Sequence, residues 1–599
     1  MYKKALAVSG VSAVVAALIV FSFASSISAR RADDVHAQWA ALADQFFEQV
    51  YFKYAPTSGT LSGLHQYDSQ LEPYSRAGLD EEVAAYLAFE KRVEAFNPSG
   101  LTQSESADRE IVLSNIRGAL LELQTIRPWE TNPGYYSDGY AQQVIGITQS
   151  AYYLMNRNFA PPDDRLRSLV AREKQMPAAL LEARKNLKNP ARISTEITLE
   201  QLPGDISFFQ HDVPTAFAAA ADPQVKADFA KSNAAVIAGL QDYQKWLRDV
   251  ELPVSKGDFA IGQDAFSKKL LYDEMVDTPL DKLLAIDREN MKANQTEFAR
   301  IAKEVDPNKT TAEVLSDLQH DHTTRDHLLQ EFRDQFNGLV SFIRAKHIVT
   351  IPSDEQPTVE ETPPFMQATT FASMDTPGPF EKVSKQAYFN VTLPLPTATA
   401  QVAEEMLEEF NVGTVTSTAV HEAYPGHYVQ FLWLPQAPSN VRKILGANSD
   451  IEGWAHYCEQ MMLDEGYGQV GTGAKDEREA KLIRLGQLED ALLRNARFIV
   501  GIEMHTHQMT FDQAVDFFVK QGYQTHAVGV VETKRGTSDA TYLYYTLGKL
   551  QIMKLREDMK KKEGSSFSLE KFHDDFLRQG FPPVKIIRQA MLGDNSPTL

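Results

Sequence analysis

The spacing of apolar residues constrains this chain more than any other feature of its sequence. In residues 79–96, and again in 225–249, apolar side chains recur every three or four positions, which places them near one face of a helix. Six further segments show similar spacing: 105–126, 164–187, 280–305, 324–347, 475–508 and 511–521. The pattern therefore predicts a mainly α fold.

Residues 347–398 interrupt this pattern, because they are rich in proline and contain three strand-like runs. The runs are HIVTIP (347–352), QATTFAS (367–373) and AYFNVTLP (387–394), and they predict a small antiparallel sheet. A strand edge in such a sheet could bind an extended peptide through main-chain hydrogen bonds. The alternative is a structural hairpin that packs on the helices.

Charge and cysteine content exclude several kinds of partner and site. The chain has 599 residues, with 60 Lys+Arg against 80 Asp+Glu and a net charge of −20. Phosphate backbones and anionic lipid surfaces would repel so acidic a protein, which argues against both as partners. The single cysteine, Cys458, excludes an intramolecular disulfide and a thiolate cage, so any metal must be held by histidine and carboxylate side chains.

The first 29 residues have the layout of a secretory signal peptide. Lys3 and Lys4 precede an uncharged apolar run over 5–24, and small residues follow it. The run is long enough that it could instead remain as an N-terminal anchor. No cysteine follows the run, so a lipid-anchored form is excluded. We therefore expect an exported protein, periplasmic or secreted.

The most informative motif is HEAYPGH at residues 421–427. In the HExxH zinc motif, two histidines four residues apart ligate the metal and the glutamate acts as a base. Here His427 follows His421 by six residues, which on a regular helix would leave the two side chains about 120° apart. Pro425 and Gly426 can distort the helix and turn His427 back toward His421. The alternative is a helix that ends at a Pro-Gly turn, with two histidines that bind no metal.

Glu452 is the candidate for a third ligand. It begins the run EGWAHYCE (452–459), in which Glu452, His456 and Glu459 lie on one helix face. Two histidines and one glutamate form the ligand set of several catalytic zinc sites, with a fourth position open for water. His456 and Glu459 are then candidates to orient the ligands. The alternative is a capping box, in which Glu452 bonds back to a main-chain amide at Ser449.

Further candidates lie downstream, where hydrolysis of an acyl bond would need a donor for the developing oxyanion. The side chains that could supply it are those of Tyr542, Tyr544, Tyr545 and His505. Arg497 or Arg535 could bind a substrate carboxylate. For each of these residues the alternative is a role in core or surface packing.

Together these motifs resemble the bacterial domain of unknown function 885 family. HEAYPGH and EGWAHYCE carry most of the resemblance, which extends over about residues 40–595 and includes TTFASMDTPGPFE (369–381). That family is similar to the gluzincin-type zinc metallopeptidases. The resemblance implies a large two-lobed helical fold with a channel between its lobes and the small sheet beside that channel. It also implies that His421, His427 and Glu452 hold one zinc ion, and that Glu422 is the general base.

The sequence thus predicts an exported zinc-dependent metallopeptidase that hydrolyses short peptides. Residues 30–599 would form one catalytic domain, with the small β region at about 347–398 and the metal-site helices at about 413–465. The predicted roles are proton transfer by Glu422, oxyanion stabilisation by Tyr545 or His505, and substrate contact by Arg497, Arg535 and Tyr544. Two alternatives remain: a zinc hydrolase of another amide or ester, such as a cell-wall peptide, and a non-catalytic periplasmic peptide-binding protein.

Overall fold

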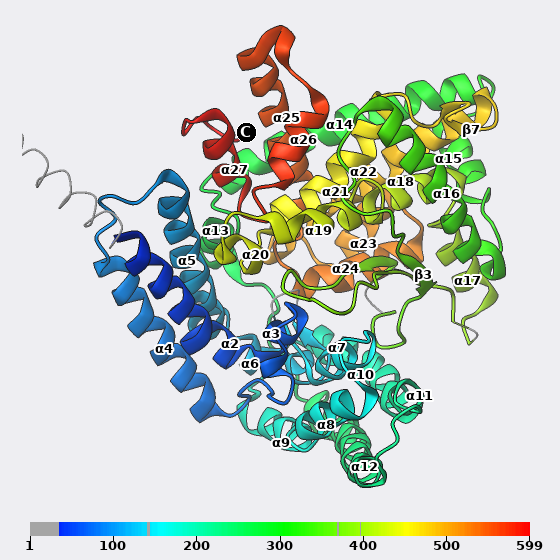
Figure 1. Ribbon diagram of the computed structural model, residues 1–599. Helices are drawn as coiled ribbons and strands as arrows, with labels where there is room; N and C mark the ends of the chain where they lie inside the picture. The colour runs from blue at the N-terminus through cyan, green and yellow to red at the C-terminus, as the bar shows by residue number, and fades with distance from the viewer. Residues whose placement is uncertain (1–34, 141–143, 368–369, 396) are drawn as a thin grey trace, which may run out of the picture.

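A computed structural model describes residues 35–599, except 141–143, 368–369 and 396. The segment 1–29, predicted to be a signal peptide or anchor, lies outside the described residues. None of the described helices is both long and apolar enough to cross a membrane. The protein is mainly α-helical, as the spacing of its apolar residues predicts (Figure 1).

Seven of the eight predicted helical segments form single helices, in two of which the last turn is widened into a short π-type segment. The segment 164–187 is the exception, because it forms two helices, α8 (Pro162–Glu173) and α9 (Met176–Asn186). Pro177 explains the break: it lies in the first turn of α9, where its missing N–H does no harm, whereas inside one continuous helix it would remove a hydrogen bond and clash with the preceding turn.

The N-terminal helices flank one side of the molecule and are shown in blue in Figure 1. Buried side chains of α4 and α5 share an apolar core with Val441, Leu445 and Ile586, which come from much later in the chain. The elements of this part are η1 (Phe47–Tyr51), α2 (Phe52–Tyr54), α3 (Pro56–Leu61), η2 (His65–Tyr67), α4 (Arg76–Ala95), α5 (Gln103–Leu121), η3 (Glu122–Ile126), α6 (Pro128–Thr131) and η4 (Pro133–Tyr136).

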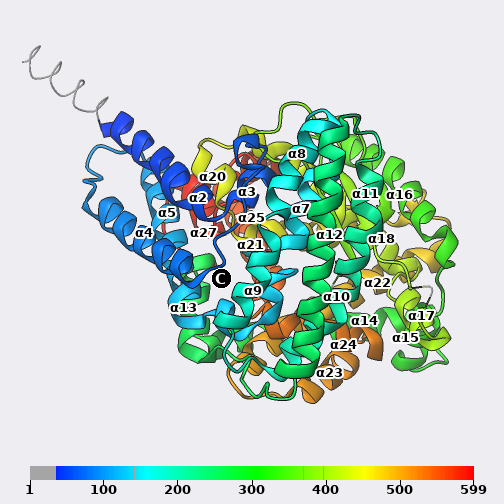
Figure 2. The ribbon, with the colours of Figure 1, turned by 90° about the horizontal axis from the view of Figure 1, so that it is seen from below.

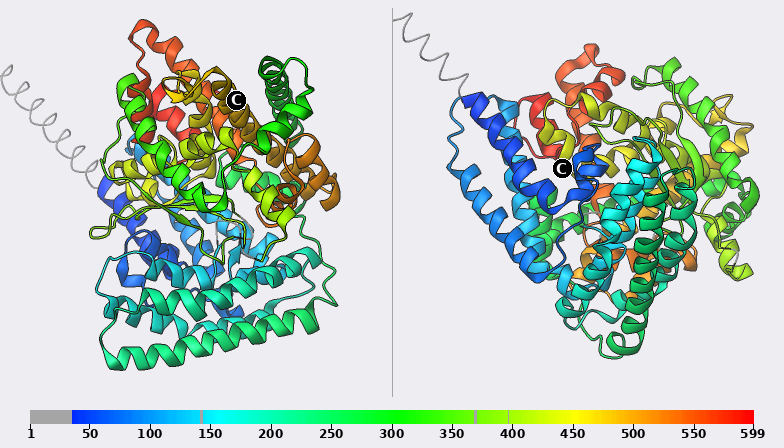
Figure 3. Two further views of the ribbon diagram at one scale, coloured as in Figure 1. Left: turned by 90° about the vertical axis from the view of Figure 1, so that its right-hand side faces the viewer. Right: turned by 60° about the horizontal axis from the view of Figure 1, so that its bottom comes forward.

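A second set of helices forms a layer with its own apolar core, drawn in cyan to green at the bottom of Figure 1 and facing the viewer in Figure 2. The left view of Figure 3 shows this layer lying beneath the rest of the chain. Besides α8 and α9, its elements are α7 (Ile147–Met155), α10 (Arg192–Ser207), η5 (Phe208–Asp212), α11 (Val213–Ala216), α12 (Pro223–Trp246) and η6 (Leu247–Glu251).

The remaining helices form the body that lies above this layer, and α24 of the body contacts α10 of the layer. Their bounds are α13 (Gly262–Asp273), α14 (Leu280–Val305), α15 (Thr311–Gln319), α16 (Arg325–Lys346), α17 (Ala400–Glu408), α18 (Val412–Glu422), α19 (His427–Trp433), η7 (Leu434–Gln436), α20 (Asn440–Ile444), α21 (Asn448–Asp464), α22 (Glu477–His505), α23 (Phe511–Lys520), α24 (His526–Ser538), α25 (Tyr544–Glu563), η8 (Gly564–Ser566), α26 (Leu569–Leu577) and α27 (Val584–Leu592).

The predicted sheet exists, but its composition and direction differ from the prediction. Three strands lie in the order β3 (Thr358–Glu361), β5 (Tyr388–Val391) and β4 (Ala372–Asp375). Only β4 and β5 pair antiparallel, whereas β3 and β5 are parallel. Two two-stranded pairs are also present: β1 (Gly139–Tyr140) with β2 (Val144–Ile145), and β6 (Gln469–Val470) with β7 (Gly473–Ala474).

The run 347–352 is not a strand, although its composition favours one. Its apolar side chains are buried in the core, but its main-chain groups bond to side chains from distant helices. The carbonyl of Ile348 accepts from His573, and that of Thr350 accepts from Trp433. The apolar composition therefore reports burial correctly, while long-range partners replace the expected strand neighbour.

Candidate metal centre

The Pro-Gly turn between α18 and α19 brings the two histidines of the motif together. α18 ends at Glu422 and α19 begins at His427. The amide of Gly426 donates to the carbonyl of Val420 at 3.0 Å, and a Cβ at position 426 would lie only 1.8 Å from the carbonyl oxygen of His421. Only glycine fits so close an approach. The imidazole rings of His421 and His427 consequently stand perpendicular, with centroids 4.8 Å apart.

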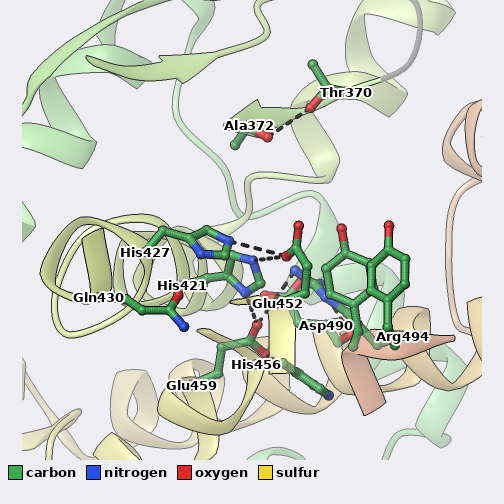
Figure 4. A network of polar contacts seen from close by, with 12 residues as sticks. Thr370, Ala372, His421, His427, Gln430, Glu452, His456, Glu459, Asp490 and Arg494 are labelled. Atoms are coloured by element: carbon green, nitrogen blue, oxygen red, sulfur yellow. Dashed lines mark hydrogen bonds and ion pairs between the residues drawn. The ribbon is translucent and has the colours of Figure 1, made fainter. Parts of the chain in front are cut away.

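Glu452 reaches this pair from α21 (Figure 4). Its Oε2 lies 3.4 Å from Nε2 of His421 and 3.2 Å from Nε2 of His427. Two ligand atoms bound tetrahedrally at about 2.0–2.1 Å from one zinc ion lie about 3.3 Å from each other. One ligand atom from each of the three buried side chains lies within 4.8 Å of the others, and within the described residues this is the cluster found to be suited to a metal ion.

The capping alternative for Glu452 is wrong. α21 begins at Asn448, and no side chain of its own first turn caps it. Instead, Glu274, from the loop after α13, accepts hydrogen bonds from the amides of Asn448 and Ser449 at 3.2 and 2.9 Å. Glu452 is therefore left to face the histidines.

A close contact between α21 and α25 determines how near Tyr545 lies to the histidines. A Cβ at Gly548 of α25 would lie 1.8 Å from the carbonyl oxygen of Ser449. The absence of a side chain at position 548 lets the two helix backbones touch. As a result, the ring of Tyr545, one turn earlier on α25, lies 6.2 Å from the ring of His421.

Glu459 orients the first histidine from behind. Nδ1 of His421 donates to Glu459 at 2.7 Å, which directs Nε2 toward Glu452. His456 donates to the other oxygen of Glu459 at 2.9 Å, and Arg494 lies 3.6 Å from the oxygen that His421 bonds. Burial raises the pKa of Glu459, but the charge of Arg494 and the hydrogen bonds from His421 and His456 outweigh this, so the pKa lies well below its usual range. A fully buried carboxylate is therefore held in its charged form.

The same balance acts on His421 and Glu452. Burial lowers the pKa of His421, but its bonds to Glu452 and Glu459 raise it more, to about 9. Burial raises the pKa of Glu452, yet the two histidines bring it well below its usual range. In this arrangement the positive charge is held by histidine; a bound cation would take its place, because metal ligation needs neutral histidine.

Glu422 lies next to the cluster without belonging to it. Its side chain is buried, and Oε2 has no hydrogen-bond partner in the described part of the chain. Burial is the main cause that raises its pKa, which the nearby His427 and His421 partly offset. A carboxyl group of raised pKa that lines a cavity is suited to accept and return a proton.

The cluster opens into a cavity of about 460 Å³ between the body and the α7–α12 layer. One wall carries His421, Glu422, His427, Glu452 and the cavity-facing side chains of α22, α24 and α25. The opposite wall consists of α10 residues 194–201 and the loop residues Asn132, Asp138 and Gly139. Residues 372–374 of β4 line the same cavity, so the small sheet lies beside it, as predicted.

A family model described as "Bacterial protein of unknown function (DUF885)" matches residues 56–591, nearly the whole chain. The chain belongs to this family. The sequence resemblance at family level is thereby confirmed. No curated protein matches the chain.

Two solved structures of similar proteins share the fold of this DUF885 member. One is described as a "putative lipoprotein of unknown function" from Shewanella oneidensis; it is 27% identical, with a TM-score of 0.73, and the match covers 92% of this chain and 99% of that one. The other is a "putative lipoprotein" from Colwellia psychrerythraea, at 19% identity and a TM-score of 0.76, covering 93% of this chain and 99% of that one.

Of the downstream candidates, Tyr545 is the tyrosine that lines the cavity of the DUF885 protein. Its hydroxyl accepts a hydrogen bond from Arg535 at 2.9 Å, which leaves its own proton available to a group in the cavity. Burial raises the pKa of Tyr545 to about 12, although Arg535 lowers it in part, so the phenol stays protonated. Tyr542 and Tyr544 are buried behind it, and Tyr544 donates to Asp539 at 2.7 Å.

His505 does not reach the cavity, so its predicted role is wrong. Its Nε2 donates to the carbonyl of Gly536 at 2.7 Å, and its Nδ1 accepts from the amide of Ile261 at 3.3 Å. Burial is the main cause that lowers the pKa of His505, which falls to about 4. His505 is therefore a neutral core residue. The error arose because His505 shares a helix face with Arg497 but lies eight residues further along α22, about 12 Å along the axis.

Arg497 and Arg535 both line the cavity, as predicted, but each already has a partner. Arg497 makes two hydrogen bonds to Glu532, at 2.6 and 2.8 Å, and its guanidinium lies 4.7 Å from the centroid of the Tyr545 ring. Arg535 bonds Tyr545 and lies 3.2 Å from Asp539. This pairing disfavours the predicted binding of a substrate carboxylate by either residue.

Sequence reasoning missed two groups in the cavity. Arg494 and Asp490 form an ion pair of 2.6 Å one turn apart on α22, and Arg494 also approaches Glu459. An acid and a base four residues apart are visible in a sequence and could have been found. Asp138 lies in a loop, and no sequence pattern marks it.

Proposed function

We propose that this protein is an exported zinc-dependent metallopeptidase that hydrolyses short peptides. The observation that carries the proposal is the convergence of His421, His427 and Glu452, with ligand atoms all within 4.8 Å of one another, beside Glu422, whose Oε2 has no partner in the described residues. Two histidines and one glutamate form a ligand set that favours zinc and leaves a position for water.

The three ligand residues would hold the ion, with Glu459 fixing the orientation of His421. Bound zinc would supply Lewis-acid polarisation of a carbonyl and lower the pKa of water toward 7. Glu422 accepts a proton from the attacking water and returns it to the leaving nitrogen, because it is the unbonded carboxyl next to the ligands. Tyr545 donates its phenol proton as a hydrogen bond to the oxygen that becomes negative.

The edge of β4 is suited to align an extended peptide. β4 is paired on one side only, with β5. The amide of Thr392 donates to the carbonyl of Phe371 at 2.7 Å, so by the alternation of an antiparallel pair the main-chain groups of Ala372 and Met374 point to the open edge. Thr370 already bonds the carbonyl of Ala372 at 2.8 Å on that side (Figure 4). A cavity of about 460 Å³ has room for a short peptide, but not for a folded protein.

The proposed location is outside the cytoplasm. The basic start, apolar run and small residues of segment 1–29 support export. The description of the Shewanella and Colwellia proteins as lipoproteins supports export of the family members they represent. The net charge of −20 argues against nucleic acid as a partner.

Metal content and peptide turnover test the proposal together. Wild-type protein should carry about one zinc ion per chain and release new amines from a panel of short peptides, detected by mass spectrometry. Glu422→Gln should keep the metal and lose about 10²–10⁴-fold in kcat/KM, because it removes the general base. Glu196→Gln, on the exposed side of α10, is the matched control and should resemble wild type.

Absence of stoichiometric metal in the wild type, or full rate in Glu422→Gln, would refute the proposal. Turnover confined to esters or cell-wall peptides would instead identify the alternative hydrolase. Tight peptide binding without turnover would identify a binding protein.

A further inference from the structure

The charges that line the cavity are unevenly paired. Each of its lysine and arginine side chains has a carboxylate partner, so no cation in the lining is free to bind a substrate carboxylate without breaking an ion pair. The pairs are Arg494 with Asp490, Arg497 with Glu532, Arg535 with Asp539, and Lys534 with Glu200. Lining carboxylates outnumber lining cations, and the excess is concentrated at two places.

One of these places is the metal side. There Glu422 and Glu452 belong to the proposed reaction, and the positive charge of Arg494 favours the charged form of Glu409. The other place is the opposite wall, formed by α10 and by Asn132, Asp138 and Gly139 around η4 and the start of β1. Asp138 on this wall has no ion-pair partner in the described part of the chain, and the structure assigns it no role in the reaction.

Several buried oxygens around Asp138 lack hydrogen-bond donors. Its Oδ2 accepts from the Gln201 amide at 2.8 Å, but its Oδ1 is buried without a partner among the described residues. Asp205, one turn after Gln201 on α10, is fully buried, and both of its carboxyl oxygens lack a partner.

Such a group of buried acceptors is costly unless something donates to it. Burial and the charge of Asp138 both raise the pKa of Asp205 well above its usual value, and burial raises the pKa of Asp138 to about 7. The two carboxyls therefore hold fewer than two negative charges while the cavity is empty. A cation placed beside Asp138 would supply donors and favour the charged form.

We propose that Asp138, backed by Asp205, binds a cationic group of the peptide substrate, either an alkylammonium or a guanidinium. This inference rests on the proposed peptidase function and specifies its substrate class. Both kinds of group carry several N–H donors, and either could bond the carboxyl of Asp138 where this residue lines the cavity. Asp138 lines the cavity and makes the contact, whereas Asp205 is buried and acts only through its electrostatic interaction with Asp138. The wall opposite the metal residues thus selects the substrate.

The cationic group could come from a peptide N-terminus or from a lysine or arginine side chain. Four peptides of one parent sequence distinguish these sources. The parent is acetylated and amidated and carries no charge. The second has one lysine, the third has a free N-terminal amine, and the fourth has one glutamate in place of the lysine. For the wild type, kcat/KM should be about 10-fold or more higher for the second or the third peptide than for the parent, and lowest for the fourth, because a charge-assisted hydrogen bond is at stake.

Asp138→Asn should reduce the preference for the cationic peptide by about tenfold, whereas Glu196→Gln, on α10, should retain it. The comparison of peptides in the wild type needs no variant, so it remains decisive if Asp138→Asn does not fold. Binding of the lysine peptide and of the parent to Glu422→Gln, measured by calorimetry, tests the same preference without turnover.

The outcomes separate the two hypotheses. If the wild type hydrolyses none of the peptides, yet calorimetry shows the cationic preference, the peptidase function fails and the cation site stands. If it hydrolyses them all at one rate and binds them equally, the cation site is refuted: the carboxyls then share a proton only, and the peptidase function stands. Retention of the full preference in Asp138→Asn also overturns the assignment.

Discussion

The helix α21 has two buried faces, and each meets a histidine in a different electrical setting. On the face toward the cavity, Glu452 and Glu459 contact His421, whose pKa rises to about 9. On the opposite face, Tyr457 donates to Nε2 of His573 at 2.9 Å, while Nδ1 of His573 donates to the carbonyl of Ile348. Burial lowers the pKa of His573 to about 3.

Both histidines are buried, so burial alone does not decide whether a charge is held in this interior. The partners decide it: His421 contacts two carboxylates, whereas His573 bonds a phenol and a main-chain carbonyl. A site that already holds one positive charge among carboxylates can exchange it for a metal ion. A histidine whose partners are neutral acts as a polar packing residue.

The largest expected effect comes from removing a carboxylate on the cavity face. Glu452→Gln keeps the shape of the side chain but replaces an anionic ligand with a neutral amide. Zinc affinity should fall by more than the about 10–100-fold that loss of an outer carboxylate costs. Metal per chain after dialysis against a graded chelator measures it. Asp464→Asn, at the exposed end of the same helix, is the control. Full metal content in Glu452→Gln would remove Glu452 from the ligand set.

A smaller effect is expected for Glu459, which contacts His421 on the side away from Glu452. Glu459→Gln removes the charge that accepts from both His421 and His456. Zinc affinity should fall by about 10–100-fold, because His421 loses its orientation and part of its basicity. Competition with a chelator of known affinity measures the change. Glu459→Asp retains the charge at a longer distance. Its zinc affinity should lie between those of the wild type and Glu459→Gln, which separates loss of charge from loss of packing. Wild-type affinity in Glu459→Gln would show that this carboxylate is only structural.

The two faces of α21 also differ in how far the sequence predicts them. The side-chain spacing of Glu452, His456 and Glu459 depends only on the helix period, and the Pro-Gly pair explains how His427 can return to His421. These local rules nominated His421, His427 and Glu452, and the resemblance to the family implied their role as ligands. His573 lies more than a hundred residues from Tyr457, and nothing local in the sequence brings them together.

The same distinction explains the errors elsewhere. The helices were predictable because apolar spacing is local, whereas 347–352 has strand composition but takes its hydrogen-bond partners from distant helices. The sequence predicts Arg497 as a possible binder of a substrate carboxylate, but in the fold its guanidinium is already paired with Glu532. Asp138 could not be found at all, because what marks it is one carboxyl oxygen without a partner among the described residues, and this depends on the fold. Composition and period thus indicate elements, and only the fold indicates pairing.

The smallest expected effect comes from His573, on the face of α21 opposite the cavity. This effect is a change in how the free energy of unfolding depends on pH. Below about pH 6.5 the unfolded chain protonates His573, but the folded protein does so only near pH 3. The unfolded state therefore binds more protons between these values, and the free energy of unfolding should fall by about 1.4 kcal/mol for each pH unit of acidification because of this residue. His573→Gln can donate to Ile348 and accept from Tyr457 without titrating. Denaturant unfolding at pH 6.5 and 5.5 should show a loss that is about 1 kcal/mol larger in wild type than in His573→Gln, because the unfolded histidine is already half protonated at pH 6.5. Equal losses would mean that His573 is protonated in the folded state, and that the two faces of α21 treat histidine alike.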